Sequence, residues 1–411
     1  MSTKTHLFLA LSRSGWGETA FGIHLAKELH KRGDQCVFFA NPSAAPLFRH
    51  LPFAYEQVTD HLGGLIKLFL ESYISESSVG SIILADFNTS HGVLREMGVD
   101  ARFLLKYDVP VVAVDTWSST ESGYAIDVFG NKQKGIGDWI KGVPFRLLPV
   151  PIIRPEGLTG ACRFLPEAAQ PARKIRNHFR ESLGLRTGDF GILLCTAGWQ
   201  HANYNDPHGE RIARAVPELF IHYVNALGRD VHLVHVGPTR FGENGALNGR
   251  YHWLPSVPTQ HFDLLLGSMD LMVSFNISAA TIGKAITSKI PVIVLQNSFE
   301  GNSTDEIVAG LSVRPSDTVL EWIRDAVPMY PFRLWPLGFS RFLAPVLEGN
   351  DYLTALEVNE WLEEEKFLET CNRLLHSPTE REAVQNRQAK YIDQVLCLPA
   401  PSEVLSTYLG G

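Results

Sequence analysis

The segment Met269–Leu295 reads MDLMVSFNISAATIGKAITSKIPVIVL, and its pattern predicts the fold. Two apolar runs of strand length, Asp270–Phe275 and Pro291–Leu295, flank a helical stretch, Ala279–Thr287. A helix that connects two buried strands is the usual crossover of a parallel sheet. This segment therefore predicts an α/β protein in which helices cover a parallel sheet.

The turn between the first of these strands and the helix consists of small and hydroxyl residues. Backbone N–H groups at a helix N-terminus, together with hydroxyl groups, can hold a diphosphate. We therefore expect a ligand site at Asn276, Ser278, Ala279, Ala280 and Thr281. The simpler alternative is that Ser278 only caps the helix.

The same alternation of strand, loop and helix extends through most of the chain. Further strands are expected at His6–Leu11, Cys36–Ala40, Ser81–Ala85, Val109–Val114, Gly191–Cys195 and Val231–Val236. We predict two Rossmann-like, doubly wound domains that face each other across a cleft, with ligands at the carboxyl ends of the strands.

Proline residues and the loss of periodicity mark Leu147–Glu167 as a connection between these domains. The predicted limits are an N-terminal domain at 1–150, a linker at 151–175, a C-terminal domain at 176–377, and a helix and tail at 378–411 that can cross back to the first domain. Helices are expected at Ala355–Leu375 and Pro378–Leu396.

Composition excludes several classes of protein. The 411 residues are 45% hydrophobic and 20% charged, with a net charge of −7, which disfavours a nucleic-acid partner. No apolar run is long enough for a membrane span, and no cleavable signal is present. The five cysteines are scattered without a C-x-x-C pair, which indicates free thiols in a reducing compartment. We expect a cytoplasmic protein.

The first strand is followed by a loop with two glycines, formed by Ser14, Gly15, Trp16 and Gly17. Glycine allows a ligand to approach the backbone closely. A dinucleotide site is disfavoured, because the third glycine is misplaced and the second strand ends without an acidic residue. A tight turn without a ligand and a loop that faces a substrate both remain open.

A second polar loop follows the strand Gly191–Cys195 and contains Trp199, Gln200 and His201. Trp199 can stack on a flat ligand, and the other two can form hydrogen bonds with it. A surface loop with a buried tryptophan is the alternative. A metal site at His201, Asp206 and His208 is not expected, because their spacing matches no standard site.

The segment Asp270–Leu295 resembles the donor-binding half of GT-B glycosyltransferases, in the branch that includes the peptidoglycan N-acetylglucosaminyltransferase. Ser278–Thr281 is similar to the turn of that family, and Pro291–Leu295 to the strand after it. The resemblance implies a nucleoside-diphosphate sugar as co-substrate. It also implies donor contacts from Trp199, Gln200, His201, Gly237, Trp253, Gln296 and Asn297, and an acceptor on the first domain.

The sequence departs from this family at three places. Ser278 replaces a glycine, Lys284 stands where a ribose-binding glutamate is expected, and Trp16 and Glu18 stand where many members have a histidine base.

Three acidic residues are candidates for the general base that deprotonates the acceptor. Asp115 is the first choice, before Glu18 and Asp86. The predicted function is a metal-independent transfer of a glycosyl group to a small-molecule acceptor, with no tightly bound cofactor. A nucleotide-sugar epimerase and a binding or scaffold protein with the same fold are the alternatives. The sequence contains no feature that names the donor, the acceptor or an oligomeric state.

Overall fold

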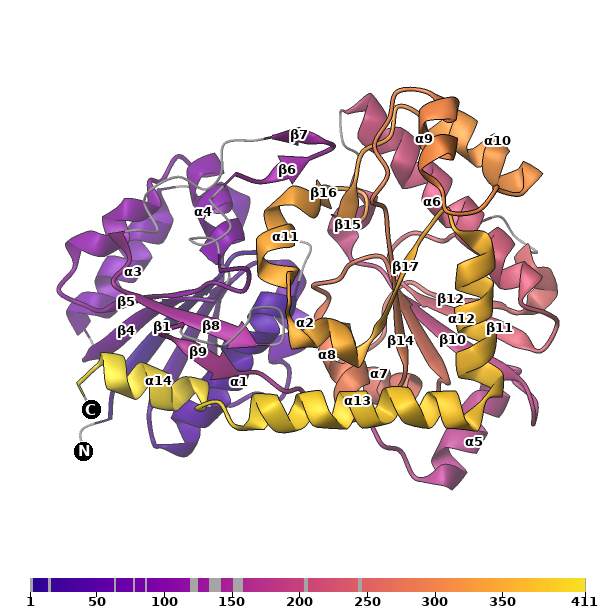
Figure 1. Ribbon diagram of the computed structural model, residues 1–411. Helices are drawn as coiled ribbons and strands as arrows, with labels where there is room; N and C mark the ends of the chain where they lie inside the picture. The colour runs from indigo at the N-terminus through magenta and orange to yellow at the C-terminus, as the bar shows by residue number, and fades with distance from the viewer. Residues whose placement is uncertain are drawn as a thin grey trace. The chain divides into compact units, whose positions relative to one another are not determined.

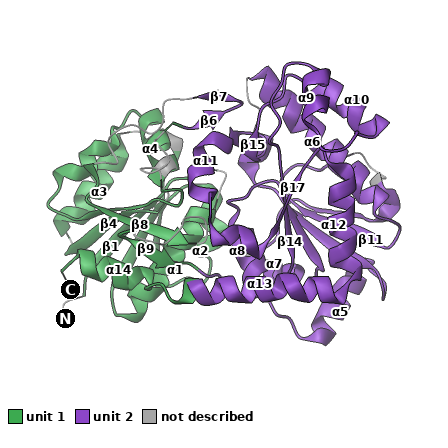
Figure 2. Ribbon diagram, in the orientation of Figure 1, with its two compact units in different colours: residues 1–125, 134–164, 395–411 green, residues 126–133, 165–394 purple. Residues whose placement is uncertain are grey.

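The structure is a computed structural model, and it describes residues 3–13, 16–62, 64–76, 78–85, 87–118, 125–132, 142–150, 158–202, 206–242 and 246–410. The chain divides into two compact units (Figure 2). Unit 1 comprises residues 1–125, 134–164 and 395–411, and unit 2 comprises residues 126–133 and 165–394. Each unit is described by itself below.

Unit 1 is built on a parallel sheet with the strand order β3-β2-β1-β4-β5-β8-β9 in its described part (Figure 1). The strands are β1 Thr5–Ala10, β2 Gln35–Ala40, β3 Ala54–Gln57, β4 Val79–Leu84, β5 Val111–Val114, β8 Phe145–Val150 and β9 Ala161–Arg163. The helices are α1 Gly17–Lys31, α2 Ala45–Phe48, α3 Leu65–Glu76, α4 Phe87–Glu96 and α14 Pro401–Tyr408, with short 3₁₀ turns at Pro42–Ala44, Asp60–Leu62 and Ala101–Lys106.

The central strand β1 explains why this sheet has helices on both faces. All of its residues are buried, as expected for a parallel strand that is covered on two sides. Leu7 and Leu9 pack into one apolar cluster with Leu70 of α3, whereas Phe8 packs into the opposite cluster with Phe21 of α1. The period of two along the strand thus divides the core into two layers.

Unit 2 repeats the plan with a parallel sheet of strand order β12-β11-β10-β13-β14-β17. Its strands are β10 Phe190–Cys195, β11 Val231–Val236, β12 Tyr251–Leu254, β13 Leu271–Ser274, β14 Val292–Gln296 and β17 Glu357–Glu360. Its helices are α5 Arg173–Ser182, α6 Pro207–Ala226, α7 Thr259–Gly267, α8 Ala280–Thr287, α9 Thr304–Gly310, α10 Asp317–Ala326, α11 Ser340–Leu347, α12 Glu364–His376 and α13 Pro378–Leu396, with 3₁₀ turns at Gly198–His201, Ala246–Gly249 and Asp351–Ala355. Both units therefore have the Rossmann-type order, and the prediction of two such domains is confirmed.

A small antiparallel sheet adds a segment from the first part of the chain to unit 2. Its order is β15-β16-β6-β7, with β6 Asp127–Val128, β7 Asn131–Lys132, β15 Phe332–Leu334 and β16 Gly338–Phe339. The buried Asp127 carboxylate accepts hydrogen bonds from the backbone N–H groups of Ser340, Arg341 and Phe342, at 2.9, 3.2 and 2.8 Å. It satisfies the free N–H groups at the start of α11, which ties residues 126–133 to unit 2.

The C-terminal helix α14 packs within unit 1. The Tyr408 hydroxyl donates to the backbone oxygen of Arg146 at 2.8 Å, and its ring stacks on Phe145. Glu28 of α1 accepts a hydrogen bond from the backbone N–H of Ser402 at 3.1 Å. The preceding helix α13 belongs to unit 2 as far as Gln394, so the chain passes from one unit to the other in the last turn of this helix.

Two predictions of secondary structure were wrong. The expected connection Leu147–Glu167 includes most of β8 and all of β9. Pro149 is tolerated in β8 because the pairing with β5 ends at Leu147, so no hydrogen bond on that side needs its missing N–H. The expected helix Ala355–Leu375 begins with β17, and α12 starts only at Glu364.

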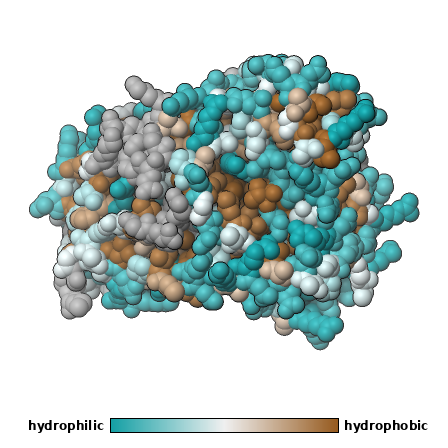
Figure 3. Space-filling model, in the orientation of Figure 1, coloured by the Kyte–Doolittle hydropathy of each residue, from teal (hydrophilic) through white to brown (hydrophobic). Residues whose placement is uncertain are grey.

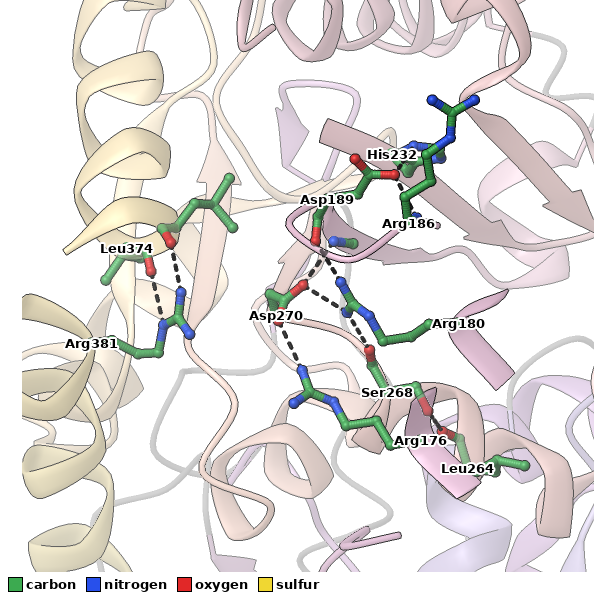
Figure 4. Close-up of polar contacts among 12 residues, drawn as sticks. Arg176, Arg180, Arg186, Asp189, His232, Leu264, Ser268, Asp270, Leu374 and Arg381 are labelled. Atoms are coloured by element: carbon green, nitrogen blue, oxygen red, sulfur yellow. Dashed lines mark hydrogen bonds and ion pairs between the residues drawn. The ribbon is translucent and has the colours of Figure 1, made fainter. Parts of the chain in front are cut away.

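The amino end of the unit 2 sheet is held together by charges (Figure 4). Asp270, just before β13, accepts hydrogen bonds from Arg176 at 2.9 Å, from Arg180 at 2.8 Å and from the backbone N–H of Gly191 at 2.9 Å. Arg180 also donates to the backbone oxygens of Ser268 and Asp189. This network fixes α5 against the strands, so the aspartate of the GT-B-like segment has a structural task here.

Candidate functional site

The carboxyl end of the unit 2 sheet contains the predicted donor residues. The strand order reverses between β10 and β13, and open α/β sheets bind ligands outside the carboxyl ends of such strands. The two loops that leave β10 and β13 are joined by the segment after β15. The Gln200 side chain donates to the backbone oxygen of Trp335 at 3.1 Å, and the backbone N–H of Trp335 donates to the backbone oxygen of Phe275 at 2.9 Å.

A chain of hydrogen bonds runs across the ends of β10 and β11. The Tyr251 hydroxyl accepts from the backbone N–H of Phe241 at 2.7 Å, and it also forms a hydrogen bond with Nδ1 of His235 at 2.9 Å. Nε2 of His235 forms a hydrogen bond with Oγ1 of Thr196 at 2.9 Å, and Oγ1 of Thr196 forms another with Nε2 of His201 at 2.9 Å. Because the Thr196 hydroxyl has a single proton, it can donate to only one of the two imidazoles, so the tautomers of His235 and His201 are linked through it.

Burial keeps both histidines of this chain neutral. It lowers the pKa of His235 to about 3, with a further contribution from His201, and it lowers the pKa of His201 to about 4. Burial also raises the pKa of Tyr251 to about 12. The three titratable side chains of this chain are therefore neutral, and the charge beside them is the Arg240 guanidinium, which lies over the Tyr251 ring at 5.1 Å from its centroid.

Gly237 follows β11 and leaves room for this chain. A Cβ atom at Gly237 would lie 1.9 Å from Oγ1 of Thr196 and 2.9 Å from Nε2 of His235. Its backbone oxygen accepts a hydrogen bond from the indole N–H of Trp253 at 2.8 Å. The structure thus places two predicted donor residues, Gly237 and Trp253, in contact with each other.

The loop after β10 is fixed by Gln200. Its Oε1 accepts from the backbone N–H of Ala197 at 2.8 Å while its Nε2 binds Trp335, so both polar atoms serve the loop itself. Trp199 is partly buried beside it. Asp206, which the rejected metal hypothesis included, caps α6 by accepting from the backbone N–H groups of His208 and Gly209.

The turn between β13 and α8 differs from the alternative in which Ser278 only caps the helix. The helix cap is Ala279, without a side-chain hydrogen bond, and the Ser278 hydroxyl donates instead to Oδ1 of Asn276 at 2.8 Å. Asn276 Oδ1 also accepts from the backbone N–H of Ser278 at 2.9 Å. Capping by Ser278 is therefore wrong. Thr281, in the first turn of α8, is partly exposed.

Lys284 occupies the position where the family resemblance implies a glutamate. Its ammonium group forms an ion pair with the carboxylate of Asp263 on α7. Its charge is balanced inside unit 2, and Lys284 is not an available cation for a ligand.

The two residues predicted after β14 have different surroundings. Asn297 is fully buried, and its side chain binds the backbone of Phe299 and Tyr330, so it shapes the loop. Gln296 is buried and donates through Nε2 to Glu360 at the end of β17, at 2.7 Å. Its Oε1 is buried without a hydrogen-bond partner in the described part of the structure.

Sequence reasoning missed two charged residues at this end of the sheet, Glu360 and Arg333. Arg333 lies in β15, and its backbone oxygen accepts from the N–H of Ile277, next to the turn before α8. The strands that carry both residues were not expected, since Glu357–Glu360 is a short polar edge strand and Phe332–Leu334 is a strand of only three residues.

The predicted acceptor-side residues belong to unit 1. Asp115 follows β5 and is fully buried, whereas Glu18 is partly exposed in the first turn of α1. Trp16 is 41% exposed, and Gly17 is the first residue of α1. The remaining candidates, Asp86, Ser14 and Gly15, lie outside the described residues.

Neither a metal cluster nor a membrane span is found in the part of the chain that the structure describes. Its His, Cys, Asp and Glu side chains form no group of three or more that could hold a metal ion. None of its helices combines the length and the hydropathy that crossing a membrane requires. On the face shown in Figure 3, hydrophobic side chains form separate patches within a mostly hydrophilic surface.

Two Rossmann-type sheets in one chain are typical of the GT-B class of fold, and the likeness to solved structures confirms that this chain has a GT-B-like fold. The chain is similar to the glycotransferase of kitacinnamycin, at 13% identity over 99% of each chain with a TM-score of 0.55. It is equally similar to Anabaena Alr3699/HepE in complex with UDP and glucose, at 12% identity over 100% of this chain and 99% of that one, with a TM-score of 0.55.

A putative UDP-N-acetylglucosamine 2-epimerase from Listeria monocytogenes also matches, at 12% identity over 100% of this chain and 95% of that one, with a TM-score of 0.54. At these identities the likeness shows the fold. The chain belongs to a family of unknown function (DUF6365), whose model matches residues 25–410. No curated protein matches the sequence.

Proposed function

We propose that this protein is a metal-independent glycosyltransferase that binds a nucleotide-activated sugar at the carboxyl end of the unit 2 sheet. The observation that carries the proposal is the start of α8 at the point where the strand order reverses. The first turn of this helix has no side-chain cap, and Thr281 is partly exposed within it. The N–H of Ile282 already donates to the backbone oxygen of Ala279, so the N–H groups of Ala280 and Thr281 and the Thr281 hydroxyl are the groups that would bind the diphosphate of a donor.

The other groups around this turn are consistent with the donor. The neutral chain from Tyr251 to His201 and the ring of Trp253 offer hydrogen bonds and an apolar surface to a nucleoside. Backbone N–H groups at α8 would stabilise the leaving diphosphate as negative charge develops on it. No metal ion is required if the helix N-terminus carries out this task.

Unit 1 would supply the acceptor and the general base. Asp115 was the first choice from the sequence, but it is fully buried. Glu18 is partly exposed at the start of α1 and is the better candidate to accept a proton from the acceptor hydroxyl.

Thermal unfolding with a panel of nucleotides and nucleotide sugars tests the proposal. A ligand that binds the folded state raises the apparent melting temperature by mass action. We expect one nucleoside diphosphate and its sugar conjugates to stabilise the wild type and Thr281→Val to lose most of this shift. Thr318→Val is the matched control, because Thr318 is also the second residue of a helix, α10.

A wild-type protein that no nucleotide stabilises would contradict the proposal. So would equal shifts in the wild type and Thr281→Val. Release of free nucleoside diphosphate from the stabilising sugar conjugate, in the presence of candidate acceptors, then separates transfer from binding alone.

A further inference from the structure

Glu360 is held rigidly at the end of β17. Its Oε1 accepts from Nε2 of Gln296 at 2.7 Å and from the Ser298 hydroxyl at 2.8 Å, and its Oε2 accepts from the backbone N–H of Ser298 at 2.7 Å. These bonds also orient the amide of Gln296, because only its NH₂ group can donate to the carboxylate. Its carbonyl oxygen, Oε1, therefore points elsewhere.

Two buried atoms near this carboxylate have no hydrogen-bond partner in the described residues. They are Oε1 of Gln296, whose side chain belongs to a residue only 7% exposed, and Nε of Arg333. Arg333 forms no ion pair or side-chain hydrogen bond within that part of the chain. Burial lowers the pKa of its guanidinium, and the charge of Glu360 partly opposes this effect.

The place of Arg333 in the fold connects it to the donor turn. Its two neighbours form bridges to the loops at the sheet end, Phe332 with Asn297 and Leu334 with Asn276. These neighbours are buried, so the alternation along β15 turns the Arg333 side chain away from the apolar core that Phe332 enters. The Arg333 side chain is partly exposed, but its Nε atom is buried and has no hydrogen-bond partner in the described residues. Buried polar atoms without a partner are rare and call for an explanation such as a ligand.

We propose that Arg333, Gln296 and Glu360 form a subsite for the anionic, hydroxyl-bearing part of the ligand. Arg333 donates to a charged oxygen, while Oε1 of Gln296 and the carboxylate of Glu360 accept from neighbouring hydroxyl groups. The charged oxygen belongs either to the phosphate next to the sugar or to a carboxylate on the sugar, and both present the same chemistry to a guanidinium. That the ligand is a nucleotide rests on the proposed function. That Arg333 binds an anion does not depend on it.

Calorimetric titration of the full chain tests this subsite, with inorganic pyrophosphate, UDP, UDP-glucose and UDP-glucuronic acid as probes. A charge-assisted hydrogen bond contributes enough to predict a roughly tenfold to hundredfold weaker affinity in Arg333→Met. Arg333→Lys keeps the charge and should recover part of the loss. Arg324→Met, at an exposed position of α10, is the control and should bind as the wild type does.

The probes separate the two sources of the charged oxygen. An equal loss for pyrophosphate, UDP and UDP-glucose assigns Arg333 to the phosphate, and a loss confined to UDP-glucuronic acid assigns it to a sugar carboxylate. Melting of the unliganded protein gives a second measurement. Arg333→Met should melt close to the wild type, because the substitution removes no ion pair or side-chain hydrogen bond within the described residues.

Four results are decisive against one claim or both. Equal affinities of the wild type and Arg333→Met for every probe overturn the subsite, and so does an Arg333→Met protein that does not fold. In that case, loss of nucleotide binding in Thr281→Val would still support the proposed function. Pyrophosphate binding that needs Arg333, without binding of any nucleotide, supports the subsite and contradicts the proposed function. A wild type that binds none of the probes contradicts both.

Discussion

The two ends of the unit 2 sheet use their polar residues in different ways. At the amino end, Asp270 is bonded to Arg176, Arg180 and a backbone N–H, so its charge is matched inside the protein. At the carboxyl end, the histidines are neutral, and both Gln296 and Arg333 keep a buried atom without a partner in the described residues. The polar groups around Asp270 at the amino end therefore stabilise the fold. At the carboxyl end, the unpartnered atoms of Gln296 and Arg333 are ones that a ligand could bind.

The largest effect is expected at the amino end. Asp270→Asn removes the negative charge between two arginines, and Arg180 is only 12% exposed. Removal of one partner from a buried ion pair costs about 3–5 kcal/mol of stability. Urea unfolding should show this loss, whereas Arg176→Gln, at a side chain 38% exposed, should cost about 0–1 kcal/mol. Similar losses of stability in Asp270→Asn and Arg176→Gln would contradict the account in which the buried pair of Asp270 with Arg180 contributes most of the stability.

A smaller loss is expected from Gly237→Ala at the carboxyl end. The added Cβ would lie 1.9 Å from Oγ1 of Thr196, so the threonine must rotate and give up its bonds to both histidines. Overpacking of this kind costs about 1–3 kcal/mol. In a double-mutant cycle, Thr196→Ala with Gly237→Ala should cost less than the sum of the single changes. Additive losses would contradict the steric account.

The smallest effect concerns pH. The unfolded state protonates a histidine near its ordinary pKa of 6.5, while folded His235 resists protonation down to about 3. The stability that neutral His235 contributes is fully present above about pH 6.5 and is lost as the pH falls toward 3. His235→Gln should therefore reduce the slope of unfolding free energy against pH by about 1.4 kcal/mol per unit between about pH 6 and about pH 5.

The sequence predicted the two parallel sheets because their central strands are continuous apolar runs. It missed β3 and β17, which lie at sheet edges and carry polar residues such as Glu56 and Glu357 that break this pattern. It also missed β8, where Pro149 suggested a linker. The proline is acceptable because the pairing with β5 ends at Leu147, and this pairing joins residues far apart in the chain.

The candidate site could be predicted only where loops follow the central strands. The residues after β10 and β13, such as Thr281, are adjacent in sequence to strands that the pattern reveals. Arg333 and Glu360 reach the same end of the sheet through β15 and β17, whose positions depend on long-range pairing. The ion pair of Lys284 with Asp263 joins two helices and has no sequence signature of its own.

Amide hydrogen exchange with and without UDP tests the central claim most directly, because it shows where in the chain a nucleotide binds. The account predicts slower exchange in residues 196–202, after β10, and 276–284, around the start of α8, with the amino end near Asp270 unchanged. Thr281→Val should remove this protection. Protection confined to unit 1, or none in either loop at saturating UDP, would contradict a donor site at the carboxyl end of the unit 2 sheet.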